Sequence, residues 1–86
     1  MLFVEHRVWR RRDDGRVVFY RCLQQLGREA YAVQSADIFS PAAGPADSAA
    51  SDARFIELLR EESPLVRCTW HASLDLAIGA HDDDFA

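Results

Sequence analysis

The fold of this chain is decided largely by residues 2–24, which read LFVEHRVWRRRDDGRVVFYRCLQ. Valines and aromatic residues alternate loosely with polar residues on both sides of Asp14-Gly15, as is typical of half-buried strands. The Asp-Gly dipeptide supplies the positive φ that a two-residue hairpin turn requires. We therefore predict a β-hairpin closed by this dipeptide. In its register three pairs lie opposite each other: Arg11 and Val18, Trp9 and Tyr20, and Arg7 and Cys22.

A third strand is predicted over residues 29–39, EAYAVQSADIF, after a break at Gly27. The alternative for this part of the chain is a helix over residues 17–32. Five apolar residues support it by recurring at helical spacing: Phe19, Cys22, Leu23, Leu26 and Ala30. A glycine inside that helix would cost about 1 kcal/mol relative to alanine. The β-branched and aromatic start of the segment also favours the strand.

Residues 40–51, SPAAGPADSAAS, contain two prolines and small residues, and we predict that they form a mobile loop. A helix over residues 52–63 follows, with Ser51 or Asp52 as its N-cap and Pro64 as its end. Its buried stripe is expected to consist of four apolar residues: Phe55, Ile56, Leu58 and Leu59.

Residues 65–71, LVRCTWH, have the composition of a fourth strand, and residues 73–85, SLDLAIGAHDDDF, that of a last helix capped by Ser73. One face of this helix would carry Leu74, Ala77, Ile78, His81 and Phe85. The predicted order is β-β-β-α-β-α. It indicates a single α+β domain over residues 1–86, a mostly antiparallel sheet of about four strands with two helices packed on one face.

Composition narrows the class of protein. No apolar run approaches the roughly 20 residues of a membrane span, and the N-terminus has the reverse order of a secretory signal, so we expect a cytoplasmic protein. All ten basic residues are arginine, which excludes chemistry that needs lysine. Residues 1–28 hold seven arginines against three acids, whereas residues 29–86 hold three against eleven. The net charge of −4 argues against nucleic acid and for a basic partner.

Metal binding and catalysis are both disfavoured by the sequence. Cys68 and His71 form a C-x-x-H element that Cys22, His6 or His81 would have to complete as a zinc site. On a strand these two residues point to opposite faces, so we predict no metal site. The run Asp82 to Asp84 lacks the alternate spacing and the glycine of a calcium loop. No nucleophile motif is present, and we predict neither an enzyme nor a cofactor.

Two charged surfaces are candidates for partner binding. The first is acidic and lies on the two predicted helices: Glu57, Glu61, Glu62, Asp82, Asp83 and Asp84. Its last three members would sit at the negative end of a helix dipole, which is unfavourable unless the terminus frays or a partner compensates. The second is a nucleic-acid-binding alternative on the N-terminal hairpin: Arg7, Trp9, Arg10, Arg11 and Arg12.

Residues 17–39, VVFYRCLQQLGREAYAVQSADIF, together with residues 73–85, resemble small bacterial immunity proteins of contact-dependent and related polymorphic toxin systems. The resemblance implies a small α+β protein that binds and neutralises a cognate toxin domain, frequently a basic nuclease. It assigns no functional residue. We therefore expect a protein-binding module with a protein partner, with the nucleic-acid-associated or regulatory role as the alternative.

Overall fold

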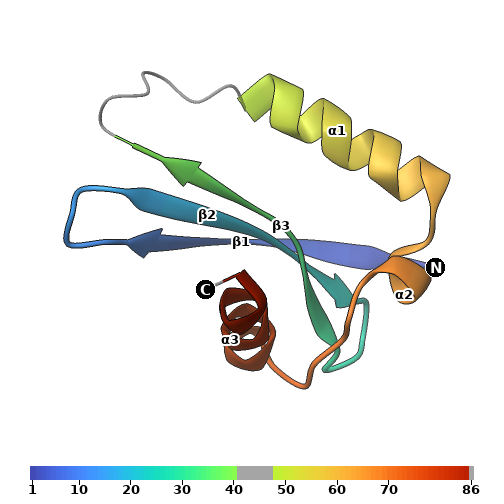
Figure 1. Cartoon of the computed structure of the whole chain (residues 1–86). Coiled ribbons are helices and arrows are strands. Elements are labelled where there is room, and N and C mark those ends of the chain that lie inside the picture. Colours follow the sequence, from blue (N-terminus) through green and yellow to red (C-terminus); the bar gives the residue numbers. More distant parts are fainter. Residues whose placement is uncertain (41–47, 86) are drawn as a thin grey trace.

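The structure is a computed structural model that describes residues 1–40 and 48–85, with side chains throughout these ranges except at positions 48, 49 and 85. Three strands form one antiparallel sheet in the order β1-β2-β3: β1 Phe3–Arg11, β2 Val17–Gln25 and β3 Tyr31–Phe39. Three helices follow: α1 Ser48–Glu61, α2 Pro64–Arg67 and α3 Leu74–Phe85 (Figure 1). The α+β class is confirmed. Of the helices in the described ranges, none is long and apolar enough to cross a membrane.

The first hairpin is confirmed, but its predicted register is wrong by one residue. Arg12 and Arg16 close a three-residue loop, with the Arg12 amide donating to the Arg16 carbonyl at 2.9 Å. Gly15 takes the left-handed position of this loop, with φ of 86°. Trp9 consequently lies opposite Phe19, where Tyr20 was predicted. A shift of one residue exchanges the faces on which paired side chains meet.

The other two predicted pairs shift in the same way, so that Arg11 lies opposite Val17 and Arg7 opposite Arg21. The helix over residues 17–32 is not formed, because β2 covers its first half and a turn follows with Gly27 at φ of 78°. The third strand is confirmed as β3. Its pairing with β2 contains a bulge, since Arg21 faces Ser35 and Cys22 faces Val33.

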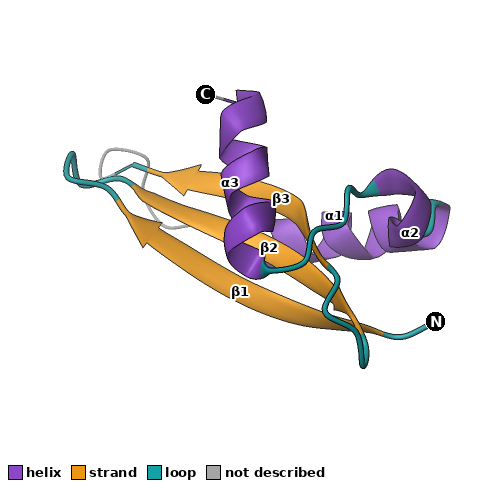
Figure 2. Ribbon diagram, turned by 90° about the horizontal axis from the view of Figure 1, so that it is seen from below, coloured by secondary structure: helices purple, strands orange, loops and turns teal. Residues whose placement is uncertain are grey.

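The two long helices lie on opposite faces of the sheet, so the prediction that both pack on one face is wrong (Figures 1 and 2). On the α3 side, Ile78 packs with Val18, Tyr20 and Cys22 of β2, and these residues form the buried core. Val8 of β1 packs against this cluster. The α1 side receives the alternate residues of each strand, because successive side chains of a strand point to opposite faces.

The predicted fourth strand over residues 65–71 is wrong. Pro64 occupies the first turn of the short helix α2, and the Ser63 side chain caps it by accepting a hydrogen bond from the Leu65 amide. Only His71 keeps a strand-like contact: it forms an isolated bridge with Tyr31 through backbone bonds of 2.8 and 2.7 Å. Proline at the first helical position and a serine cap therefore outweighed the β-forming composition of this segment.

The two long helices, α1 and α3, have boundaries that agree with the sequence-based prediction at three of their four ends. Ser73 caps α3, its hydroxyl accepting from the Leu76 amide at 3.1 Å, and α1 ends before Pro64. The start of α1 was predicted four residues too late, so the expected caps Ser51 and Asp52 lie inside the helix. The predicted loop 40–51 therefore ends earlier, and its positions 41–47 fall outside the described residues.

The predicted apolar stripes are only partly buried. Phe55 and Leu58 of α1 are half-buried, whereas Ile56 and Leu59 are exposed. On α3, Ala77 and Ile78 are buried, and Leu74 and His81 are half-buried. The side chain of Phe85, also placed on that stripe, lies outside the described part of the chain.

Candidate functional site

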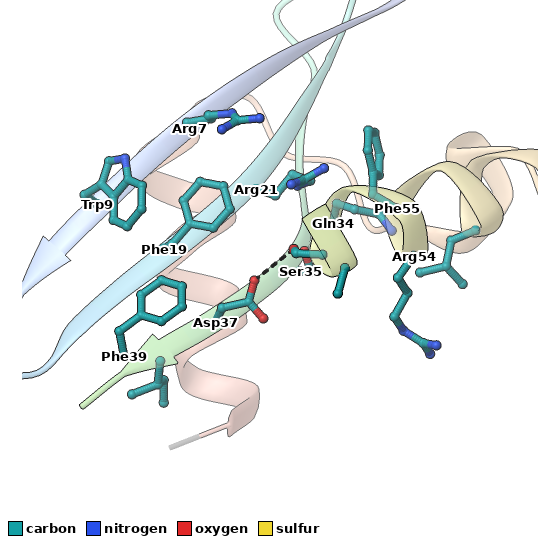
Figure 3. Close-up of a pocket in the computed structure, with 14 residues that line it drawn as sticks. Arg7, Trp9, Phe19, Arg21, Gln34, Ser35, Asp37, Phe39, Arg54 and Phe55 are labelled. Carbon is teal, nitrogen blue, oxygen red and sulfur yellow. Dashed lines mark hydrogen bonds between the residues drawn. The ribbon is translucent and has the colours of Figure 1, made fainter. Parts of the chain in front are cut away.

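A groove of about 610 Å³ lies between α1 and the sheet. Three aromatic side chains, one from each strand, form what we call the aromatic floor: Trp9, Phe19 and Phe39 (Figure 3). The ring centroids of Trp9 and Phe19 are 4.7 Å apart, and those of Trp9 and Phe39 are 6.2 Å apart. Trp9 remains 58% exposed, although tryptophan is usually well buried. Phe19 is buried and Phe39 is half-buried, so Trp9 is the ring of the floor that is open to a ligand.

Arg21 of β2 lies deep in this groove, with only 3% of its side chain exposed. It donates a hydrogen bond to Asp52 of α1 and lies 3.7 Å from a carboxylate oxygen of Glu5. Its guanidinium also stacks over the Phe55 ring at 4.8 Å. A buried charge requires such partners. The hydrogen bond from Arg21 lowers the pKa of the Asp52 carboxyl below its ordinary value.

Two further arginines line the groove nearer to solvent. Arg7 of β1 contacts Glu5 at 3.2 Å and Asp52 at 3.8 Å. Arg54 of α1 is exposed. The acidic residue in the lining is Asp37 of β3, which accepts a hydrogen bond from the Ser51 hydroxyl at 3.3 Å. Aromatic rings and guanidinium groups thus share one concave surface.

Polar contacts help to hold helix α1 over the sheet. Among its residues whose side chains the structure describes, none is fully buried. Its contacts with the sheet include the Asp52–Arg21 hydrogen bond, the Ser51–Asp37 hydrogen bond and the stacking of Phe55 on Arg21. The tightly packed core lies on the other face, under α3. The α1 side of the sheet is therefore left partly open.

The predicted acidic surface is divided by the sheet. Glu57, Glu61 and Glu62 are exposed on and just after α1, whereas Asp83 and Asp84 are exposed on α3, across the sheet. The six predicted acids therefore do not form one continuous surface.

Asp82 is engaged in a contact within the fold. The buried Tyr20 hydroxyl donates to its Oδ1 at 2.9 Å, and Arg10 donates to its Oδ2 at 2.9 Å. Burial raises the pKa of Tyr20, and the bond to Asp82 raises it further. Although Asp82 lies at the negative end of a helix, these two donors compensate its charge.

The predicted arginine cluster is also separated. Arg7 and Trp9 belong to the groove, whereas Arg10 pairs with Asp82 on the α3 side. Arg11 and Arg12 are exposed near the hairpin tip. Sequence reasoning missed Phe19, Phe39 and Phe55 as site residues. The correct hairpin register was the signal needed to place Phe19 beside Trp9.

The C-x-x-H element lies in a second, smaller hollow. Cys68, His71, His81 and Asp84 all line this space of about 260 Å³. The predicted strand over residues 65–71 is not formed, so it does not separate Cys68 from His71. Still, the described residues contain no group of three or more His, Cys, Asp or Glu side chains arranged to hold a metal. Burial raises the Cys68 pKa, which disfavours a reactive thiolate.

The chain was also compared with known proteins. A scan against protein-family models found no match. Searches of curated proteins and of solved structures likewise found none. The groove and its chemistry are therefore the guide to function.

Proposed function

We propose that this chain is a protein-binding module whose main contact surface is the groove between α1 and the sheet. The observation that carries this proposal is the aromatic floor flanked by arginines, in which Trp9 is largely exposed. Tryptophan, tyrosine and arginine are the residues most enriched among those that dominate binding energy at protein interfaces. The partly open sheet face provides the concavity in which such anchors are desolvated.

The immunity function is the more specific form of this proposal. In that form, the partner is a bacterial toxin domain, and Glu57, Glu61 and Glu62 supply complementary charge to basic residues beside the groove. If a neighbouring gene encodes a toxin domain, its product is the partner to test first. Replacing these three glutamates with glutamine is expected to slow its association. An unchanged association rate would remove the acidic residues from the interface.

Site-specific photo-crosslinking tests the general proposal. A photoreactive phenylalanine analogue is placed at position 9 in one variant and at position 76 in another, in cells that encode the chain. Trp9 and Leu76 are both 58% exposed, but Leu76 belongs to α3 on the opposite side of the sheet. We expect a discrete crosslinked protein from position 9 only. The same products from both positions would contradict binding at the groove.

A second candidate function is binding of single-stranded nucleic acid, favoured by the three aromatic rings on neighbouring strands. Proteins stack bases on such rings and hold phosphates with arginine. However, Arg7 and Arg21 already contact Glu5 and Asp52, which reduces the positive charge available to phosphates. Binding of a twelve-nucleotide oligouridine that weakens steeply with salt would support this candidate.

A further inference from the structure

The arginines of the groove differ in whether they are already paired with a carboxylate. Arg7, Arg21 and Arg54 line it together with the carboxylate of Asp37. The carboxylates of Glu5 and Asp52 pair with Arg7 and Arg21. The Asp37 carboxylate already accepts a hydrogen bond from Ser51. Arg54 forms no ion pair with the described residues, so it is the groove arginine available to an anionic group of the ligand, and binding surfaces are matched by partners of opposite potential.

Arg21, the deepest of these arginines, and Arg54 differ in access to a ligand. Arg21 Nε is buried and makes no hydrogen bond within the described residues, and the Glu5 oxygen near it is 3.7 Å away. A buried donor without an acceptor costs free energy, so this arginine is held in place by its other contacts. At the rim, Arg54 is exposed and projects from α1 beside the same groove (Figure 3).

The arginines and the aromatic floor lie side by side. In Figure 3 the rings of Trp9, Phe19 and Phe39 occupy one end of the groove, and Arg21 and Arg54 lie toward α1. A ligand that fills both parts needs a large apolar group next to an acid. We infer that the groove binds a segment of a protein partner in which an aromatic or large aliphatic side chain neighbours an aspartate or glutamate. This inference rests on the proposed protein-binding function and specifies the partner.

A protein segment fits this surface better than a nucleic acid does. Three carboxylates lie within or next to the groove, those of Glu5, Asp52 and Asp37. They would repel a nucleic acid, which carries a phosphate at every nucleotide. A single carboxylate needs only Arg54, which forms no ion pair with the described residues. Arginine also binds carboxylates in a bidentate geometry that is stronger than a neutral hydrogen bond.

Selection from a random peptide library tests the inference. A library of twelve-residue peptides displayed on phage is selected for binding to the full chain. Peptides that bind the full chain but not its Trp9→Ala variant are called Trp9-dependent. We expect Trp9-dependent peptides that contain Asp or Glu within two positions of an aromatic or large aliphatic residue. Trp9-dependent peptides without acids would overturn the inference and leave the protein-binding function standing. The absence of any Trp9-dependent peptide would count against both.

A synthetic copy of the best peptide then measures the contribution of each part of the groove. By fluorescence anisotropy, Trp9→Ala should weaken binding by about 30-fold and Arg54→Ala by about 5-fold to 10-fold. Arg60 and Leu76 supply the matched controls, because both are exposed and neither lines the groove. Arg54 has an exposed side chain, so its replacement leaves the fold intact. Equal affinity of the Arg54→Ala and Arg60→Ala variants would refute the role of the acid.

The charge of the peptide and the type of polymer are tested in the same assay. Replacing the acid of the peptide by its amide should reproduce the loss seen with Arg54→Ala, and the two changes together should cost little more than either alone. Additive losses would show that the acid binds elsewhere. A twelve-nucleotide oligouridine that binds the groove more tightly than every selected peptide would replace the protein segment with nucleic acid as the ligand.

Discussion

Replacing Asp82 with alanine tests whether the acidic end of α3 is a contact of the fold. Asp82 receives hydrogen bonds of 2.9 Å from the Tyr20 hydroxyl and from Arg10, and thereby fixes the last turns of α3 to the first two strands. Tyr20 is 2% exposed, so its hydroxyl has little access to water as an alternative acceptor. Asp83 and Asp84 are exposed neighbours on the same helix and serve as matched controls.

The expected loss of stability follows from these two contacts. A hydrogen bond to a charged group contributes about 1.5–3 kcal/mol, and we take the lower end because the Asp82 side chain is 36% exposed. The half-exposed pair with Arg10 adds about 0.5 kcal/mol. Asp82→Ala should therefore lower the free energy of unfolding by about 2 kcal/mol, which corresponds to a fall in Tm of about 10 °C for a chain of this size.

The measurement is urea unfolding followed by tryptophan fluorescence, with thermal unfolding by circular dichroism alongside it. Asp83→Ala and Asp84→Ala should change the free energy of unfolding by no more than about 0.5 kcal/mol, because they remove charge from the negative end of a helix. A double-mutant cycle with Tyr20→Phe should give a coupling of about 1 kcal/mol. If Asp82→Ala is no more destabilising than Asp83→Ala, the contact does not stabilise the fold.

Three further predictions concern titratable groups. Arg21 lowers the pKa of Asp52, so their contact stabilises the fold above the unfolded-state pKa of about 3.9. This stabilisation is lost as pH falls through the lower folded-state pKa. In acid titrations followed by unfolding, Asp52→Asn should therefore reduce the dependence of the free energy of unfolding on pH. The pKa of Tyr20 is raised, so its contribution to the free energy of unfolding is complete below about pH 10 and is lost as pH rises through the folded-state pKa. Tyr20→Phe should remove this loss of stability at alkaline pH. Burial raises the pKa of Cys22 to about 11, so an aromatic disulfide reagent at pH 8 should leave Cys22 unmodified in the native protein and react with both Cys22 and Cys68 in urea; rapid native labelling of Cys22 would contradict its burial.

The elements that the sequence predicted well are those with local causes. Strand composition and Gly15 indicated the hairpin, Ser73 marked the start of α3, and Pro64 limited α1. Each of these signals acts within a few residues through backbone geometry or capping. The fourth strand failed for the same type of reason. The Ser63-Pro64 start of a short helix was a local signal that β-branched composition obscured.

The candidate site was less predictable because it depends on contacts between distant residues. Arg7 and Trp9 were identified, but as members of an arginine cluster that the structure separates. Arg21 of the groove pairs with Asp52, a residue 31 positions away, on a helix whose start was misplaced. Composition and spacing contain no information on which face of the sheet α1 would cover.

The sequence by itself determined the first three strands, the two long helices and most of the residues that end them, but not the short helix α2. The tertiary structure alone decided which face each side chain joins. Asp13, Asp14 and Gly15 allow a two-residue or a three-residue loop, and both use the positive φ of Gly15. The three-residue loop places Val8 in the core under α3 and leaves Trp9 on the groove side. Burial of a whole face depends on this shift of one residue, because strand side chains alternate with a period of two.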